Sequence, residues 1–492
     1  MSILTSFSRS FTGITANSRS VQPGWLFLAY PGAKSDGRNY IPQAIQAGAA
    51  AIAWEKDHFT WNENWQVSNA PVKDLKQQIG QIAAEFYHHP SSQLTMIGVT
   101  GTNGKTSVSQ WIAQCLSSLG KKTAVLGTLG NGMLGNGFLK ANTEAVNTTP
   151  DAILLQGMLA DYVAQKADVA VMEVSSHGLD QGRVNGVEFG IAILTNLSRD
   201  HLDYHGTIEA YTDAKQKLFA WEGLSHAIVN VDDAFGKVLA NLLKAQDKSC
   251  ITYGLDADAA EINICGSDLK LHDAGLSVQV TTPQGIALLA APVLGRFNAY
   301  NVLAVLSALL ALEISLQDAV AAIAQIKPVP GRMQKFGGGE LPLVIVDYAH
   351  TPDALENVLN TLREQTQGKL ICVFGCGGER DAGKRPLMGS VAIKLADVVI
   401  VTSDNPRSED PAAIICAVVS NISAGYLVEP DRAKAIKQAV QSAKPGDVIL
   451  VAGKGHENYQ EISGIKHPFD DALVAHAALK QYPSISDVRA SA

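Results

Sequence analysis

The stretch TMIGVTGTNGKTS, residues 95–107, decides how the chain is interpreted. An apolar run at 94–99 suits a buried parallel strand, and a Gly-Thr-Asn-Gly turn follows it. Apolar residues then recur at helical spacing over 108–119. Phosphate binding needs this order, because glycines let backbone N–H groups approach phosphate oxygens and the helix N-terminus adds partial positive charge.

Two side chains complete this loop. Lys105 adds a full positive charge, and the hydroxyl of Thr106 can ligate Mg²⁺. The match to the general pattern G-x-x-x-x-G-K-[ST] is not strict, because Val99 stands where that pattern has its first glycine. The alternative is a glycine-rich turn that merely joins a strand to a helix. A turn does not need lysine and threonine directly after the glycine, so we predict a nucleotide-binding loop.

The length and composition indicate a multidomain globular protein. A chain of 492 residues is too long for one core, and 46% hydrophobic with 17% charged residues is typical of soluble domains. The alternation of strands and helices favours an α/β fold. We expect three domains: residues 1–91, residues 92–331 with a central parallel-sheet ATPase of the P-loop type, and residues 332–492 with a C-terminal Rossmann-like doubly wound sheet.

Several classes of protein are disfavoured. The start of the chain lacks a basic, apolar signal region and no run of 18 apolar residues occurs, so we expect a cytoplasmic protein without membrane insertion. The net charge of −8 disfavours nucleic acid as a partner. The six cysteines are scattered and mostly lie in apolar runs, so buried free thiols are expected rather than disulfides or a metal site.

The first unit is predicted to be small. Residues 25–30 and 49–54 have the pattern of strands, whereas 41–47 and 75–87 have that of helices. A polar loop at 35–38 and the Ser18 region are typical of surface turns, so a ligand role for them needs support from elsewhere.

The central unit alternates strands and helices after the phosphate loop, with further strands at 122–126, 167–174, 189–194 and 227–231. Ligands of parallel sheets lie off the carboxyl ends of strands, and Glu173 and His201 are placed there. They are either satisfied by backbone groups or, with Thr106, form a Mg²⁺ site. Lys215 lies in a predicted helix, where a lysine is ordinarily solvated.

The rest of the central unit is predicted to contain a hairpin at 276–291 and a long apolar helix at 302–312. Residues 294–301 open this helix, and Asn298 and Asn301 lie three apart on one helical face. A linker follows at 327–332. The third unit has strands at 343–346, 370–374, 398–401 and 448–451, and a polar loop follows each one. Four such loops at one edge of a sheet predict a binding site.

At this point the sequence resembles the Mur ligases of peptidoglycan synthesis, which join an amino acid to a UDP-muramoyl precursor with ATP. The loop GVTGTNGKT at 98–106 is the family's own variant of the phosphate loop. Further motifs are NTTP at 147–150, MEVSSHG at 172–178, GGERD at 377–381 and DNPR at 404–407. The resemblance covers the whole chain.

The resemblance implies an ATP-dependent ligase that adds meso-diaminopimelate to UDP-N-acetylmuramoyl-L-alanyl-D-glutamate through an acyl phosphate, with Mg²⁺ as cofactor. We expect a monomer. A lysine-adding Mur ligase is the first alternative. The related folylpolyglutamate synthase is a second, although it is not expected to have the uridine-binding domain or the DNPR motif. A nucleotide switch that binds NTP without ligation is a third.

Carried over residue by residue, the resemblance implies four sets of site residues. Those around ATP are Gly101, Thr102, Asn103, Gly104, Lys105, Thr106, Ser107, Asn298, Arg332, Asp347 and His350. Those around the UDP-muramoyl substrate are Ser18, Ala33, Lys34, Ser35, Asn147, Thr148, Thr149, Ser175, Gln181 and Arg183. Those around the amino acid are Arg380, Asp404, Asn405, Pro406, Arg407, Gly453 and Glu457. The expected Mg²⁺ ligands are Thr106, Glu173, His201 and Lys215, and the expected catalytic residues are Lys105, Lys215, Glu173 and His201.

Two of these implied roles have a chemical logic of their own. Lys215 falls where the family carbamylates a lysine, and a carbamate converts a cation into an anionic oxygen ligand for a second Mg²⁺. Arg407 can bind the extra carboxylate that distinguishes diaminopimelate from lysine, because guanidinium groups bind carboxylates in a planar, bidentate manner. The alternative for Arg407 is a structural pair with Asp404.

Overall fold

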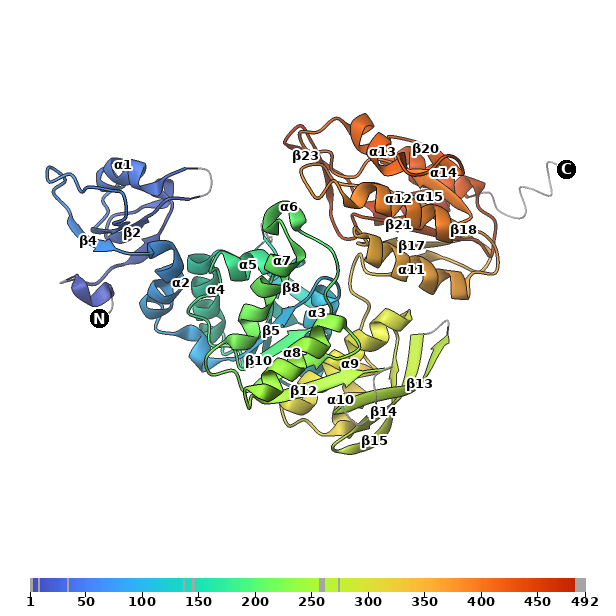
Figure 1. The fold of residues 1–492 in the computed structure, drawn as a ribbon, viewed down its shortest axis with the longest axis horizontal. Coiled ribbons are helices and arrows are strands. Elements are labelled where there is room, and N and C mark those ends of the chain that lie inside the picture. Colours follow the sequence, from blue (N-terminus) through green and yellow to red (C-terminus); the bar gives the residue numbers. More distant parts are fainter. Residues whose placement is uncertain are drawn as a thin grey trace.

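The computed structural model describes residues 3–7, 9–32, 35–135, 138–143, 147–255, 262–272 and 275–482. Three large sheets follow one another along the chain, together with a small two-stranded one. Figure 1 shows the N-terminal and C-terminal sheets on opposite sides of the central unit. The first sheet is parallel, in the order β1 (Gly13–Thr15), β2 (Trp25–Ala29), β3 (Ala51–Glu55), β4 (Ser68–Val72).

The prediction for the first unit is confirmed for β2, β3, α1 (Ile41–Gln46) and α2 (Leu75–Phe86). It missed the three-residue strand β1 and also β4, which is a mostly exposed edge strand and so carries no apolar alternation. The surface-turn interpretation of the loop at 35–38 is wrong for Arg38. Its buried guanidinium pairs with Asp36 at 2.8 Å and donates to the Asp57 carbonyl at 2.7 Å, so it has a structural role.

The central sheet has eleven strands in the order β15-β14-β13-β12-β11-β10-β5-β9-β6-β7-β8. Pairing is parallel from β13 through β6 and antiparallel at both ends. The strands predicted from the sequence are confirmed, as is the hairpin; β7, β8, β12 and β13 were not predicted. The bounds are β5 (Thr95–Thr100), β6 (Thr123–Gly127), β7 (Gly130–Gly135), β8 (Phe138–Thr143), β9 (Val169–Glu173), β10 (Ile191–Leu194), β11 (His226–Asn230), β12 (Cys250–Gly254), β13 (Ile264–His272), β14 (Gly275–Thr282) and β15 (Gly285–Ala291).

Helices cover both faces of this sheet. On one face α3 (Lys105–Ser118) packs against α9 (Arg296–Ala311) and α10 (Leu316–Ile323). α9 begins at Arg296, within the segment predicted to open the helix, and Asn301 donates to Asn298 on the predicted shared face at 2.8 Å; the apolar part predicted from 302 is thus extended by six residues. Between α3 and α9 in the chain lie α4 (Ala152–Ala164), α5 (Ser176–Asp180), α6 (Leu202–His205), α7 (Ile208–Gln216) and α8 (Ala234–Ala245).

The third sheet runs in the order β16-β17-β21-β18-β19-β20, with only β16 antiparallel among these described strands. Helices α11, α12 and α13 pack on one face, and α14 and α15 pack on the other. This is the predicted doubly wound arrangement. The bounds are β16 (Gln334–Gly337), β17 (Leu343–Asp347), α11 (Pro352–Gln365), β18 (Leu370–Phe374), α12 (Lys384–Leu395), β19 (Val398–Val401), α13 (Pro411–Val419), β20 (Tyr426–Val428), α14 (Arg432–Ser442), β21 (Val448–Ala452), β22 (Tyr459–Ile462), β23 (Ile465–Pro468) and α15 (Asp471–Lys480).

All six cysteines are free, as predicted, and three are buried; Cys416 is exposed, contrary to the expectation of buried thiols. In the described ranges no helix combines the length and apolarity needed to cross a membrane.

Candidate active site

The phosphate loop joins the carboxyl end of β5 to the first turn of α3, as predicted. Two of its glycines have left-handed φ angles, +144° at Gly101 and +87° at Gly104. A Cβ on Gly101 would strike the hydroxyl of Thr195, and one on Gly104 would strike the amide oxygen of Asn301. Both glycines are therefore required by conformation and by close approach.

The loop is held from neighbouring strand ends. The backbone N–H of Asn103 donates to Asn196 Oδ1 at 2.9 Å, and the Thr195 hydroxyl donates to the Asn103 carbonyl at 2.6 Å. The amide group of Asn103 also donates to Asp353 Oδ2 at 3.0 Å, which links the loop to α11 of the C-terminal sheet. The loop is thus fixed before any nucleotide binds.

Lys105 folds back over its own loop. Its Nζ donates to the carbonyls of Gly101 and Thr102, both at 2.8 Å. Burial lowers the pKa of Lys105, with Glu173 opposing the shift. A cation placed in this way lies at the centre of the glycine-rich turn, where the sequence pattern predicts a phosphate.

Thr106 and Glu173 are brought together at the ends of β5 and β9. The Thr106 hydroxyl donates to Glu173 Oε2 at 2.9 Å, and the guanidinium of Arg332 donates to the same hydroxyl at 3.2 Å. Thr128 donates to both carboxylate oxygens, from its N–H at 2.8 Å and from its hydroxyl at 3.0 Å. The alternative of purely backbone satisfaction is wrong for Glu173, because hydroxyl groups are among its partners.

These oxygens suit a Mg²⁺ ion, which prefers hard oxygen ligands. Gly127 leaves the space that Glu173 occupies, since a Cβ there would strike the carboxylate. Among the described residues no group of three or more His, Cys, Asp and Glu side chains is arranged to hold a metal. A Mg²⁺ ion here would therefore rely on Thr106, Glu173 and oxygens supplied by the substrates.

Within the described part of the chain, no hydrogen bond or ion pair links His201 to Thr106 or Glu173. His201 lies with Asp200 and His350: Asp200 Oδ2 is 3.4 Å from His201 Nε2 and 3.7 Å from His350 Nε2. Burial lowers the pKa of His201 to about 3, so the imidazole is neutral. Burial opposes ionisation of Asp200, but its interaction with the nearby His350 imidazole helps to hold its pKa well below the usual range.

Lys215 is buried with 1% of its surface exposed, so the solvated-lysine interpretation is wrong. Its Nζ donates to the Gly101 carbonyl at 2.8 Å and lies 4.5 Å from the centre of the Tyr211 ring. Burial, followed by the charge of Lys105, lowers the pKa of Lys215 well below its usual value. The amine is thus held beside the phosphate loop in a form that favours the neutral, nucleophilic state.

A cavity of about 1150 Å³ opens beside the phosphate loop, between α9 and the C-terminal sheet. Of the predicted ATP residues, those in its lining are Asn103, Gly104, Ser107, Asn298, Arg332 and Asp347. His350 lines a different cavity, described below. The buried carboxylate of Asp347 accepts from the backbone N–H of Met333 and of Ala349, each at 2.8 Å.

A second cavity, of about 890 Å³, lies between the N-terminal sheet and α4. Asn147, Gln181 and Arg183 line it, whereas Ser18 and Ser35 do not; the neighbours Asn17 and Ser20 do. Ser18 instead donates to Gln43 Oε1 at 3.1 Å. The predicted residues Ala33 and Lys34 lie outside the described residues.

Most residues predicted around the UDP-muramoyl substrate are linked by hydrogen bonds. Arg183 donates to the Thr149 carbonyl at 2.9 Å and to Gln181 Oε1 at 2.7 Å. The Thr149 hydroxyl contacts Ser175 Oγ at 3.0 Å, and Thr148 lies 3.2 Å from Thr128 through their hydroxyls. Through Thr128 this network reaches Glu173, to whose carbonyl the Thr149 hydroxyl also donates at 2.9 Å, so the muramoyl residues and the Thr106–Glu173 pair are joined by hydrogen bonds.

A third cavity, of about 1170 Å³, lies between the central and C-terminal sheets. It shares Asn147 and Arg183 with the second cavity, and Tyr348 with the first. The predicted amino-acid residues that line it are Arg380, Asp404, Asn405, Arg407, Gly453 and Glu457, whereas Pro406 does not. The strand-end loops predicted to converge therefore do converge.

Arg407 does not pair with Asp404 in the described structure, so the predicted partner is wrong, while a structural role for Arg407 stays an open alternative. It has a left-handed φ of +53°, and its Nη1 donates to the Gly378 carbonyl at 2.7 Å. Its Nε lies 3.5 Å from Glu461 Oε2. Asp404 instead accepts a hydrogen bond from the backbone N–H of Asn405 at 2.6 Å. Its other carboxylate oxygen lies so close to Gly453 that a Cβ added to this glycine would be only 2.6 Å away.

Three family sequence profiles match the chain in order: Mur ligase family, catalytic domain, over residues 10–87; Mur ligase middle domain, over 99–309; and Mur ligase, glutamate ligase domain, over 331–455. The UDP-N-acetylmuramoyl-L-alanyl-D-glutamate--2,6-diaminopimelate ligase of Chromobacterium violaceum is 52% identical over 470 residues, 95% of this chain and 94% of the relative. This chain belongs to the Mur ligase family. The Pseudomonas aeruginosa ligase of the same name is 50% identical to this Mur ligase over 95% of it and 94% of the relative.

Solved structures agree with this assignment. A structure titled UDP-N-acetylmuramoyl-L-alanyl-D-glutamate--2,6-diaminopimelate ligase is 40% identical to this Mur ligase, with a TM-score of 0.68 over 96% of this chain and 95% of that one. The MurF ligase from Thermotoga maritima in complex with ADP shares the fold, with a TM-score of 0.63 at 19% identity over 100% of both chains. The predicted family and three-domain α/β architecture are confirmed; the boundaries at 91 and 331 stay predictions.

The sequence interpretation missed several residues of this Mur ligase's site. Asp200 precedes His201, and Thr128 follows β6, so both lie in segments directly after predicted strands. Asn196 lies in the same segment as Asp200. Lys454 lies within a predicted site loop but was not singled out. Position after a strand was the available signal for all four; their partners depend on segments far away in sequence.

Proposed function

We propose that this Mur ligase joins meso-2,6-diaminopimelate to UDP-N-acetylmuramoyl-L-alanyl-D-glutamate with ATP, giving an amide bond, ADP and phosphate. The observation that carries the proposal is the contiguity of three cavities: the first lies beside the phosphate loop and shares Tyr348 with the third, and the third shares Asn147 and Arg183 with the second. One cavity can take ATP, one the nucleotide-sugar end of the acceptor, and one the amino acid. Relatives about half identical over nearly the whole chain are named for this activity.

The reaction has two chemical steps. The acceptor carboxylate is a poor electrophile, so its oxygen attacks the γ-phosphorus of ATP, which forms an acyl phosphate and releases ADP. The amine of diaminopimelate then attacks the acyl carbon, the C–O bond to phosphate breaks, and the nitrogen loses a proton. Lys105, at the centre of the phosphate loop, offsets the negative charge that develops in the first step.

Metal binding belongs to the same proposal. Thr106 and Glu173, with oxygens of the substrates, would hold Mg²⁺, and Lys215, once carbamylated, would hold a second ion; the predicted ligand His201 lies instead beside Asp200. Bound Mg²⁺ supplies positive charge to the phosphate oxygens. Carbamylation needs a neutral amine, which attacks CO₂ to form an N–C bond and releases a proton. The burial of Lys215 and its lowered pKa support that reaction.

The third cavity supports diaminopimelate over lysine. Two guanidinium groups, of Arg380 and Arg407, line it together with the carboxylate of Glu457. Diaminopimelate has one more carboxylate than lysine, and a second arginine gives that group a partner. We place the reaction in the cytoplasm, where the nucleotide substrates are made, and expect a monomer; light scattering of the purified protein tests the latter.

A product assay tests the proposal. The purified protein is incubated with ATP, Mg²⁺, the UDP-muramoyl dipeptide and either diaminopimelate or L-lysine, and the products are identified by mass spectrometry. We expect the diaminopimelate tripeptide and ADP in equal amounts. Preference for lysine would establish the lysine-adding alternative. ADP formed without an adduct would favour the nucleotide switch, and glutamate added to a folate in a parallel reaction would favour the folylpolyglutamate synthase alternative.

A further inference from the structure

Lys454 is a buried cation that the reaction as proposed does not use. It is the second residue after β21, and none of its surface is exposed. It is absent from the residues that line the third cavity, whereas Gly453, His456 and Glu457 are present. A lysine ammonium is stable in such a place only when its donors are satisfied, because burial of an unpaired charge is costly.

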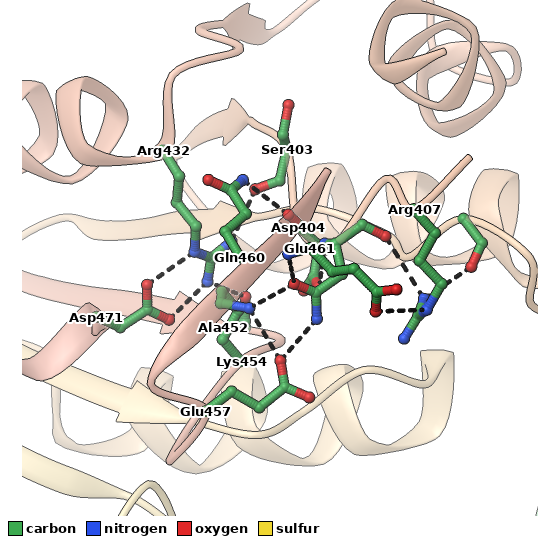
Figure 2. A network of polar contacts seen from close by, with 12 residues as sticks. Ser403, Asp404, Arg407, Arg432, Ala452, Lys454, Glu457, Gln460, Glu461 and Asp471 are labelled. Atoms are coloured by element: carbon green, nitrogen blue, oxygen red, sulfur yellow. Dashed lines mark hydrogen bonds and ion pairs between the residues drawn. The ribbon is translucent and has the colours of Figure 1, made fainter. Parts of the chain in front are cut away.

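The donors of Lys454 are directed at two residues of the amino-acid site (Figure 2). Its Nζ donates to Asn405 Oδ1 at 2.9 Å and to Glu457 Oε2 at 2.9 Å. The Tyr459 ring lies 5.5 Å from the ammonium and faces it as a third, weaker partner. Lys454 therefore joins the loop after β19 to the loop after β21 through their side chains.

These contacts orient both partners. Because Asn405 Oδ1 accepts from Lys454 and from the N–H of Glu461, its NH₂ group is the end left to donate, and it donates to Glu457 Oε2 at 2.7 Å. Glu457 Oε2 thus receives two donors. No donor from the described residues reaches Oε1, so the second carboxylate oxygen is available to the cavity that Glu457 lines.

A second buried cation fixes the backbone beneath this pair. The guanidinium of Arg432 is fully buried and pairs with Asp471 at 2.7 Å. It also donates to the Ala452 carbonyl, at the end of β21, at 2.9 Å and to the Ser403 carbonyl, in the loop after β19, at 3.4 Å (Figure 2). Arg432 therefore anchors the two loops through backbone carbonyl groups, and Lys454 anchors them through the side chains of Asn405 and Glu457.

We propose that Lys454 is a positioning residue of the amino-acid site: it holds Glu457 Oε2 and Asn405 so that Glu457 Oε1 faces an ammonium group of the incoming amino acid. The inference rests on the proposed function. It assigns Lys454 no contact with substrate. Its effect is confined to the amino acid, because neither partner belongs to the residues around ATP or around the UDP-muramoyl substrate.

The test is a Lys454→Met variant, which keeps the length of the side chain and removes its charge and donors. We expect the KM for diaminopimelate to rise about tenfold or more, as for loss of a hydrogen bond to a charged group. The KM values for ATP and for the UDP-muramoyl dipeptide should change by less than about twofold, within the range of a neutral substitution. Lys480→Met, an exposed lysine on α15, is the matched control and should leave all three values unchanged.

A double-mutant cycle separates positioning from a general structural role. If Lys454 acts through Glu457, then Lys454→Met should add little to the defect of Glu457→Gln, because the carboxylate it orients is already gone. Additive effects, or equal increases in all three KM values, would overturn the proposal. If Lys454→Met does not fold, Lys454→Gln takes its place; failure of both to fold would show that Lys454 serves stability and would equally overturn it.

The same experiment distinguishes this proposal from the proposed function. Wild-type protein that makes no diaminopimelate adduct contradicts the function itself. Wild-type protein that makes the adduct, with a Lys454→Met variant whose KM for diaminopimelate is normal, contradicts only the positioning role.

Discussion

The side-chain nitrogen of Lys215 lies 2.8 Å from the carbonyl oxygen of Gly101, which places a buried amine against the phosphate loop. No positive charge is needed at that point, because Lys105 already donates to the same carbonyl. Two lysines on one carbonyl are explained if one of them acts as a neutral amine or as its carbamate. The relationship therefore supports the proposed modification of Lys215 and leads to a direct test.

Lys215→Ala should lose most activity, at least about tenfold, and added bicarbonate with a short-chain carboxylate such as acetate should restore part of it. The reason is that the lost group is an anionic oxygen ligand, which a small carboxylate can replace. Initial rates with and without acetate measure the effect. Glu173→Ala should not be rescued, and Lys244→Ala, an exposed lysine on α8, should behave as wild type. An unmodified Lys215 in the intact mass of fully active enzyme would contradict the carbamate.

Lys105→Ala should lower turnover by about 100-fold or more, because transition-state charge on the γ-phosphate loses its cation. The measurement is the rate of ADP formation in the presence of all three substrates. Lys121→Ala removes an exposed lysine just beyond the other end of α3 and serves as the control. A folded Lys105→Ala variant with near-normal turnover would show that the nucleotide assignment is wrong.

Gly104→Ala and Gly120→Ala form a matched pair, since both positions have left-handed φ angles, +87° and +85°. A Cβ at Gly104 would strike Asn301, whereas nothing lies within 4 Å of one at Gly120. Each variant should lose about 1–2 kcal/mol of stability from backbone strain. Only Gly104→Ala should also weaken ATP use, by about 100-fold in rate if the loop moves by about 1 Å. Equal ATP kinetics in the two variants would contradict a role for the close approach of the loop to Asn301.

Arg407→Ala should lower kcat/KM for diaminopimelate by about tenfold or more, and it should affect L-lysine much less, because the extra carboxylate loses its bidentate partner. Specificity constants for both amino acids, in wild type and variant, measure the difference. Arg9→Ala, an exposed arginine of the N-terminal unit, is the control. Equal losses for both amino acids would indicate that Arg407 only supports the loop through its contacts with Gly378 and Glu461.

The free energy of unfolding should fall as the pH is lowered from about 6.5 toward 5, in part because of His456. Burial is the main cause that lowers the pKa of His456 to about 3, with Arg332 and Lys454 adding to the shift. Between these pH values the unfolded chain binds the proton and the folded protein does not, so stability rises with pH across the window. Urea unfolding at several pH values should show a shallower slope for His456→Gln, whereas His272→Gln, at an exposed position, should keep the wild-type slope. An unchanged slope for His456→Gln would contradict the assignment.

The sequence was most informative where function depends on local pattern. The phosphate loop carries its glycines, Lys105 and Thr106 within one segment, so its position and geometry follow from spacing alone. The strand-end loops of the third unit were also predictable, because the carboxyl ends of parallel strands meet at one edge. The same rule placed Glu173 at the site.

Partners that come from distant segments were not predictable. Lys215 and Arg38 are covered by residues from other parts of the sequence. The local pattern therefore predicted that both side chains are exposed to solvent, whereas the structure buries the Arg38 guanidinium and the Lys215 amine. β4 was missed because an edge strand lacks apolar alternation. His201 meets Asp200 and His350 rather than Thr106, since the contact depends on how the C-terminal sheet lies against the central one.

The hydrogen bond between Asn103 and Asp353 has a consequence for recombining this enzyme with its relatives. The cavity that we propose for ATP is lined from both sides of position 331, by Asn103 and Asn301 on one side and by Arg332 and Asp353 on the other. A chimaera that takes everything after residue 331 from another family member would receive a new amino-acid site and, unavoidably, half of a foreign ATP cavity. Transplants of amino-acid preference should therefore exchange only the loops after β18, β19 and β21 and leave α11 in place.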